Sequence, residues 1–168
     1  MSFFQSLGSG EVSYDSYIDS IVAGTLTPQY TGISALKNSD ILTATSIIAG
    51  DISRFPLIKK DITGDIIHDE DINYLLNVKA TTNASARTWK FAMAVNAILT
   101  GNSFSRILRD PKTGQALQFQ FFKPSETTVE ETNEHEIIYT FFDTLTGKTV
   151  KCRSDDVIHW KFFSHDTI

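Results

Sequence analysis

The sequence lacks the features of disulfide-stabilised, membrane-spanning and secreted proteins. Its single cysteine, Cys152, cannot form a disulfide within the chain, so the fold does not depend on crosslinks. No apolar run reaches the ~18 to 20 residues needed to cross a bilayer, and the first residues lack the basic and apolar regions of a signal peptide. We therefore expect a protein that is made and remains in the cytoplasm, without a membrane contact.

The sequence also contains fewer basic than acidic residues. The 168 residues include 15 Lys and Arg against 20 Asp and Glu, which gives a net charge of −5. A dedicated nucleic-acid-binding domain usually carries a basic excess or a basic stripe. Here the basic pairs Lys59-Lys60 and Arg106 with Arg109 are interleaved with aspartates. Apolar content of 41% fits one soluble globular domain, and we expect no dedicated DNA-binding site in it.

The residues that could perform chemistry are scattered. None of the histidines has the i, i+4 partner of a helical zinc site; they are His68, His135, His159 and His165. The densest polar cluster supplies no nucleophile, base and orienting group together; it consists of Asp155, Asp156, His159, His165 and Asp166. Gly8-Ser9-Gly10 lacks the flanking strand and helix of a phosphate loop. The sequence therefore predicts a protein without catalytic residues, metal or cofactor.

Residues 1–37 differ from the rest of the chain. They are rich in Ser, Thr and Tyr and are punctuated by Gly8, Gly10, Gly24, Pro28 and Gly32. This composition predicts a flexible N-terminal arm that docks on another surface. A folded domain is expected over residues 38–168.

The folded part begins with a helical pattern. Apolar residues recur at helical spacing from Ser39 to Phe55; the stripe comprises Ile41, Thr45, Ile48, Ile52 and Phe55, and Leu42 and Ala49 widen it. Asn38 or Ser39 is a suitable N-cap, and Pro56 ends the helix. Thr63-Gly64 then predicts a hairpin turn, and a short helix is expected over Asp71–Asn77.

A second long helix is expected over Ala84–Thr100. From Trp89 to Leu99 only Lys90 and Asn96 are strongly polar. A helix that is apolar on all sides is buried on several of them, so a partner or a sandwiched position is expected. Its candidate core or interface residues are Trp89, Phe91, Met93, Val95, Ile98 and Leu99. Gly101 fits a left-handed cap at the end of this helix.

After Gly101 the hydrophobic period changes to two, which predicts about six strands joined by short turns in a mostly antiparallel sheet. Four aromatic residues of these strands join the candidates for core or interface packing, namely Phe119, Phe121, Trp160 and Phe162. Because the helices come first and the strands later, the fold class is α+β.

Five segments in order resemble the portal protein family of long-tailed double-stranded DNA phages. They are Ile41–Leu57, Tyr74–Asn77, Leu99–Ile107, Phe122–Ser125 and Asp156–Lys161, and the resemblance covers about residues 36–168. The residues that match the family's motifs are Pro56, Gly101, Asn102, Pro124 and His159. Two departures stand out. Ala80-Thr81 replaces the family's usual Pro-Asn, and Asp166 is not followed by the glycine that leads towards the stem, clip and crown.

The resemblance implies that residues 38–168 form the wing-like α+β part of a portal subunit, without catalytic residues. It also implies a ring at one capsid vertex, through which double-stranded DNA passes without sequence recognition. The implied partners are further copies of the chain, the terminase large subunit, and capsid and head-tail adaptor proteins. The implied location is the virion, with assembly in the host cytoplasm. An alternative from another class is a truncated prophage remnant or a small capsid or tail adaptor that acts only as a protein-binding module.

Overall fold

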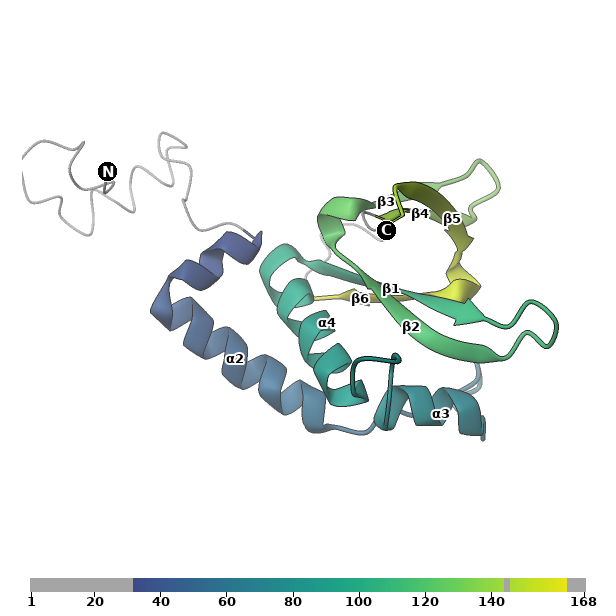
Figure 1. Cartoon of the computed structure of the whole chain (residues 1–168), viewed down its shortest axis with the longest axis horizontal. Helices are drawn as coiled ribbons and strands as arrows, with labels where there is room; N and C mark the ends of the chain where they lie inside the picture. The colour runs from purple at the N-terminus through teal and green to yellow at the C-terminus, as the bar shows by residue number, and fades with distance from the viewer. Residues whose placement is uncertain (1–31, 144–145, 163–168) are drawn as a thin grey trace, which may run out of the picture.

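A layer of helices covers one side of the strands (Figure 1). The structure is a computed structural model that describes residues 32–143 and 146–162. Three α-helices precede six strands: α2 (Ser39–Arg54), α3 (Glu70–Asn77), α4 (Ala86–Thr100), β1 (Asn102–Arg109), β2 (Ala116–Phe122), β3 (Thr127–Glu131), β4 (Ile137–Asp143), β5 (Lys148–Arg153) and β6 (Val157–Lys161). The α+β class is thereby confirmed. No helix in the described part of the chain is long and apolar enough to cross a membrane.

The first helix begins and ends as the sequence predicts, but it buries only part of the expected stripe. The Asn38 side chain caps α2 by accepting hydrogen bonds from the backbone N–H groups of Asp40 and Ile41. The buried residues are Thr45, Ala49 and Ser53, which lie at four-residue intervals. The larger Ile48 and Phe55 of the expected stripe are 43% and 65% exposed. The expected stripe is therefore confirmed only in part: Thr45 and Ala49 are buried, whereas its largest side chains are excluded because α2 packs closely against α4 and only small side chains fit between them.

The second long helix, α4, lies between α2 and the strands, as Figure 1 shows. Ser85 caps its start by accepting from the backbone N–H of Thr88, and Gly101 ends it with a left-handed φ of 83°. Two of its polar residues, Lys90 and Asn96, are buried. The Lys90 ammonium donates to the Phe55 carbonyl oxygen at 2.7 Å, and Asn96 donates to the Ala92 carbonyl oxygen at 2.8 Å.

The six strands form two antiparallel sheets of three instead of a single sheet. The first sheet has the order β2-β1-β6 and the second β3-β4-β5. Short 3-10 helices join them twice: η3 (Pro124–Glu126) leads from β2 to β3, and η4 (Ser154–Asp156) leads from β5 to β6. The division arises at these two connections, where the chain leaves an edge of one sheet and enters an edge of the other.

Two hydrophobic cores result from this layering. The first lies between the helices and the first sheet, and its buried residues are Leu75, Ala80, Trp89, Met93, Ala116 and Phe119. The second lies between the two sheets, and its buried residues are Phe104, Phe122, Tyr139, Phe141 and Cys152. The first sheet is therefore covered on both faces.

Successive side chains of β1 point to opposite faces of the first sheet, so this one strand contributes to both cores. Ser103 and Ser105 are fully buried towards α4, where Ser105 accepts a hydrogen bond from the Trp89 indole at 3.1 Å. Ser103 donates to the Met93 sulfur at 3.2 Å. Phe104, between the two serines, points into the second core. Small residues on one face let the helix approach the strand closely, and the aromatic residue fills the space between the sheets.

The segment between α2 and α4 contains less regular secondary structure than the sequence predicts. The hairpin at Thr63-Gly64 is reduced to one bridge between Lys60 and Ile66, with a left-handed Gly64.

Residues Gly32–Lys37, within the range assigned to the arm, form a 3-10 helix, η2, whose Ala35 is buried. Residues 1–31 lie outside the described part of the chain.

Candidate functional site: junctions between the helices and the two sheets

Pro56 stands at a junction of three helices. It follows Phe55, the C-cap of α2, and the carbonyl oxygen of Phe55 accepts the hydrogen bond from Lys90 of α4. An ammonium group near the last carbonyls of α2 also interacts favourably with the helix dipole. Burial lowers the pKa of Lys90. The next residue, Leu57, exchanges two 2.8 Å hydrogen bonds with the side-chain amide of Asn77 at the end of α3.

Gly101 and Asn102 connect α4 to the sheet. The Gly101 N–H donates to the Ala97 carbonyl oxygen, and its own carbonyl oxygen accepts from Phe162 N–H at 2.9 Å. This second bond ties the end of α4 to the residue after β6. A side chain at Gly101 would have to adopt a positive φ, which only glycine adopts without strain. The Gly-Asn pair thus turns the chain from helix to strand within one residue.

Asn102, His159 and Tyr139 form a chain of hydrogen bonds between the sheets. His159 Nε2 lies 2.8 Å from Asn102 Oδ1, and His159 Nδ1 lies 3.2 Å from the Tyr139 hydroxyl. Because the Asn102 oxygen is an acceptor, Nε2 carries the proton and Nδ1 accepts from Tyr139. The imidazole is therefore neutral and links β1 and β6 of the first sheet to β4 of the second.

Aromatic rings surround this histidine. The His159 ring lies 4.4 Å from that of Phe104 and 5.7 Å from that of Tyr139, measured between ring centres. Burial, with a smaller effect from the positive charge of Lys161, lowers the pKa of His159 to about 4. Burial also raises the pKa of Tyr139. Both groups are consequently held neutral at physiological pH, which suits a structural link better than a proton-transfer site.

The two 3-10 helices anchor the remaining junctions. Pro124 begins η3, which carries the chain from the first sheet to the second. At the other connection Arg109 Nε lies 2.7 Å from the Asp156 carboxylate, and Arg109 Nη2 donates to the Asp155 carbonyl oxygen. Asp155 and Asp156 of the densest polar cluster thus hold η4 against β1.

The candidate packing residues fall into two groups. Trp89, Met93 and Phe119 are buried in the first core, with Phe121 and Trp160 packed against it. Trp89 is the centre of an aromatic group, with its ring 4.8 Å from Phe119 and 5.9 Å from Trp160. The others are half-buried or exposed: Phe91, Val95, Ile98 and Leu99 are half-buried, and Phe162 is 44% exposed.

Among residues 32–143 and 146–162, no group of three or more His, Cys, Asp and Glu side chains is placed to hold a metal ion. His165 and Asp166 lie outside the described residues. Cys152 is buried in the second core, and burial raises the pKa of its thiol, which disfavours the reactive thiolate.

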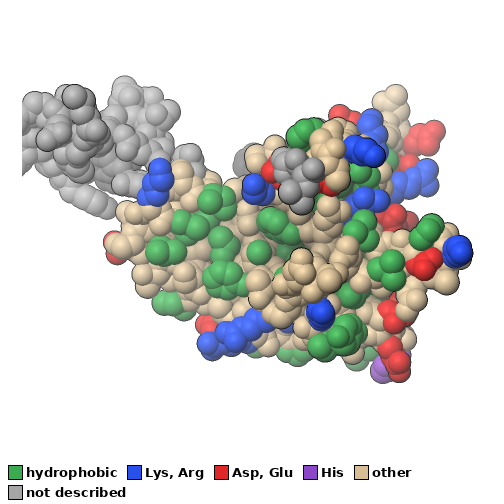
Figure 2. Space-filling view, viewed as in Figure 1, with side chains coloured by type: hydrophobic (Ala, Val, Ile, Leu, Met, Phe, Trp, Pro, Cys, Tyr) green, Lys and Arg blue, Asp and Glu red, His purple; other side chains and the backbone are tan. Residues whose placement is uncertain are grey.

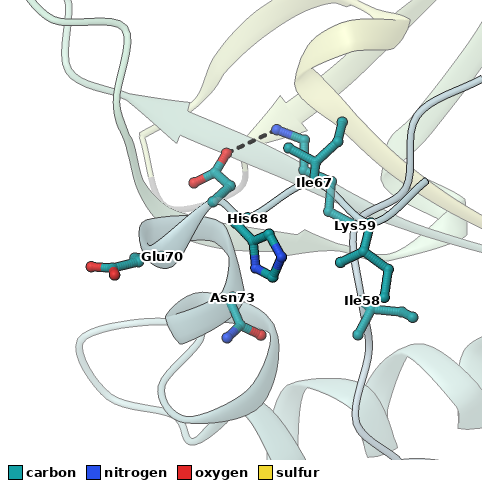
Figure 3. A pocket seen from close by; sticks show the side chains of 8 residues that line it. Ile58, Lys59, Ile67, His68, Glu70 and Asn73 are labelled. Carbon is teal, nitrogen blue, oxygen red and sulfur yellow. Dashed lines mark hydrogen bonds and ion pairs between the residues drawn. The ribbon is translucent and has the colours of Figure 1, made fainter.

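A pocket lies between the Lys60–Ile66 turn and α3 (Figure 3). Its Lys59 and Asp69 form an ion pair at 2.8 Å, and Asp69 also caps α3 by accepting from Ile72 N–H. These contacts hold the pKa of Asp69 below its usual value. The Glu70 side chain points away from the other labelled residues. The polar groups of this pocket therefore stabilise the start of a helix.

Sequence reasoning missed Tyr139 and the buried serines Ser103 and Ser105. Tyr139 gave no separate signal because it is one of three large residues that alternate along β4. In the sequence, the two serines were recognisable only as small residues at alternate positions of β1, on either side of the aromatic Phe104.

The chain belongs to the phage portal protein family, whose sequence profile matches residues 39–168. Its fold is similar to that of a chain in the neck of an empty gene transfer agent (GTA) particle, with 15% identity and a TM-score of 0.57. A chain in the virion of the native GTA particle is also similar, with 12% identity and a TM-score of 0.54.

The first of these matches covers 74% of this chain and 34% of the neck chain, and the second covers 92% and 42%. This chain thus spans less than half the length of either. No curated protein matches it. Both similar chains are components of particles, and at these identities the likeness concerns the fold.

Proposed function

We propose that this chain is the wing-like part of a portal subunit, a structural component of the ring at one capsid vertex through which DNA enters and leaves. The observation that supports this proposal is the family match over residues 39–168, which includes α2 to α4 and all six strands. In this role the chain is part of the virion, after assembly in the host cytoplasm. Its partners are other copies of itself, the capsid, head-tail adaptors and the terminase large subunit.

The work of such a subunit is mechanical. The junctions at Pro56, Gly101 and Pro124 connect the helices and both sheets, so that load on one layer passes to the next. Ring assembly requires contacts between different faces of neighbouring copies that close by rotation. A net charge of −5 agrees with a conduit, because a strongly basic surface would retain DNA by releasing its counterions. In this proposal the chain has no catalytic residue.

The proposal is tested by removing the gene that encodes this chain from its phage or prophage and examining particles after induction. We expect capsids without packaged DNA, and recovery of filled particles when the gene is supplied in trans. A matched control supplies the gene with Met93→Asp, which disrupts the first core and should fail to restore packaging. Filled particles at the normal yield in the deletion would overturn the portal role and favour an accessory adaptor.

A further inference from the structure

The two edge strands of the second sheet carry opposite charges. In the order β3-β4-β5, strands β3 and β5 are the edges, and within the described residues neither has a strand on its other side. The sequence of β3, TTVEE, has two glutamates and no basic residue. The sequence of β5, KTVKCR, has three basic residues and no acidic one. Figure 2 shows charged side chains of both signs gathered over the part of the molecule where this sheet lies.

Glu130 of β3 and Lys151 of β5 point to the same face of the second sheet, the face away from the first sheet. Their neighbours along the strands, Val129 and Cys152, pack into the second core. Successive side chains of a strand alternate between the two faces, so Glu130 and Lys151 point outward. Both are exposed.

Glu130 and Lys151 are also available for a partner. Some charges near these edges are paired within the chain: Glu131 lies 2.6 Å from His135, and Arg153 lies 3.8 Å from a glutamate just before β4. Among the residues that the structure describes, neither Glu130 nor Lys151 has an ion pair or a side-chain hydrogen bond. Each edge therefore presents one unpaired charge of opposite sign on the same face.

These charges limit how the edges of two copies can meet. An edge strand has unpaired backbone groups that can add a strand from another chain. Two β3 edges would bring glutamates together and two β5 edges would bring basic residues together, and like charges on adjacent strands are destabilising. A β3 edge beside a β5 edge brings opposite charges together instead. Charge thus disfavours pairing of identical edges and favours pairing of unlike ones.

Strand direction fits the same arrangement. Both β3 and β5 run antiparallel to β4, so they run in the same direction as each other. A second copy related to the first by a modest rotation therefore places its β5 parallel to β3. The two strands are of similar length, five and six residues. Each copy then offers one edge to the neighbour on either side, and contacts of this head-to-tail kind close into a ring when the rotation allows.

We propose that the β3 edge of one copy pairs in parallel with the β5 edge of a second copy, which brings Glu130 within reach of Lys151 and joins the second sheets into one. Strands of five and six residues give a small contact, so the free chain associates weakly through it. This inference rests on the portal role proposed above, because it names the surface through which neighbouring copies meet. The two fail separately, since edge pairing is measured on the purified chain and the portal role in particles.

The test reverses these charges in the 168-residue chain. Glu130→Lys places like charges opposite each other in the proposed contact, and so does Lys151→Glu. In an equimolar mixture of the two variants, every contact between unlike copies joins opposite charges again. A matched pair, Glu70→Lys and Lys112→Glu, makes the same changes of net charge at exposed positions outside the second sheet.

Sedimentation equilibrium over a range of high protein concentrations measures the association. We expect weak association of the parent, several-fold weaker association of Glu130→Lys and of Lys151→Glu alone, and the parent value in their mixture. The matched pair should equal the parent, alone and mixed. Circular dichroism verifies that each variant is folded, as the exposure of all four positions leads us to expect.

Crosslinking with a carbodiimide, which joins a carboxylate directly to an amine, locates the contact in the parent. Within one copy the β3 and β5 backbones are two strand spacings apart, ~10 Å, and a mixture of ¹⁵N-labelled and unlabelled chains identifies links between copies by mass spectrometry. We expect linked peptides that join β3 of one copy to β5 of another. A parent that stays monomeric at every concentration, single variants that associate as the parent does, or a mixture as weak as its components would each overturn the proposal.

Discussion

Asn102 and His159, 57 residues apart in the chain, share a hydrogen bond of 2.8 Å between Oδ1 and Nε2. The same imidazole accepts a hydrogen bond from the Tyr139 hydroxyl, so one neutral ring links β1 and β6 of the first sheet to β4 of the second. Asn102 and His159 both belong to the segments that resemble the portal family. Their contact gives a structural reason for the two motifs to occur together in one chain.

Stability should decrease as the pH falls from about 6.5 towards 4. The pKa of His159 is about 4 in the folded protein and 6.5 in the unfolded chain, so the unfolded state binds more protons in this window. Above pH 6.5 both states are neutral and the effect vanishes. Thermal melting at a series of pH values should show a loss for the parent that is smaller in His159→Gln.

The exposed His68 supplies the control for this measurement. His68→Gln should melt with the same pH dependence as the parent, because its side chain has no part in the link between the sheets. A parent whose melting temperature is constant between pH 7 and pH 4.5 would contradict the neutral-histidine account.

Met93→Asp should destabilise the protein by several kcal/mol, since Met93 is fully buried between α4 and the first sheet. Met93→Leu keeps the volume and loses only the contact with the Ser103 hydroxyl, so a cost below about 1.5 kcal/mol is expected. Urea denaturation measures both. Equal midpoints for Met93→Asp and the parent would show that the helix is not packed as described.

The contact between α2 and α4 should reject larger side chains. Ala49 is fully buried at the centre of that contact, and Ala49→Leu should cost about 1–3 kcal/mol through overpacking. Ala44→Leu, on the exposed side of the same helix, should change the free energy of unfolding by less than about 0.5 kcal/mol. A larger effect at Ala44 than at Ala49 would reverse the assignment of the buried face.

Much of the fold follows from local signals in the sequence. Asn38 and Gly101 mark helix ends through capping chemistry, which depends only on neighbouring residues. The period-two pattern likewise identifies the strands. The buried face of α2 followed only in part, because a hydrophobic pattern favours its isoleucines, whereas close helix packing selects the small residues Thr45, Ala49 and Ser53.

The site depended on contacts that a single sequence does not encode locally. Pairing of Asn102 with His159 requires the register of β1 on β6, and the position of Tyr139 requires the second sheet to fold over the first. The division into two sheets was missed for the same reason. Which strands pair on either side of η3 and η4 depends on contacts between residues far apart in the sequence, whereas the turns themselves depend on neighbouring residues.

In isolation the 168-residue chain should be monomeric or weakly associating, and it should bind duplex DNA weakly and without sequence preference. As the proposed wing-like part of a portal subunit, the chain would supply only part of that subunit's contact surface. Light scattering after gel filtration, together with a salt titration of DNA binding, measures both properties. A stable closed ring would place the main assembly contacts within these residues.

The most direct test of the portal role is the location of this chain in assembled particles. A short epitope inserted at the exposed turn between β3 and β4, after Asn133, leaves both cores intact. Particles carrying the tagged protein are then labelled with gold-conjugated antibody and imaged before tail attachment. The account predicts label at a single vertex of each capsid. Label distributed over all vertices, or along the tail alone, would contradict it.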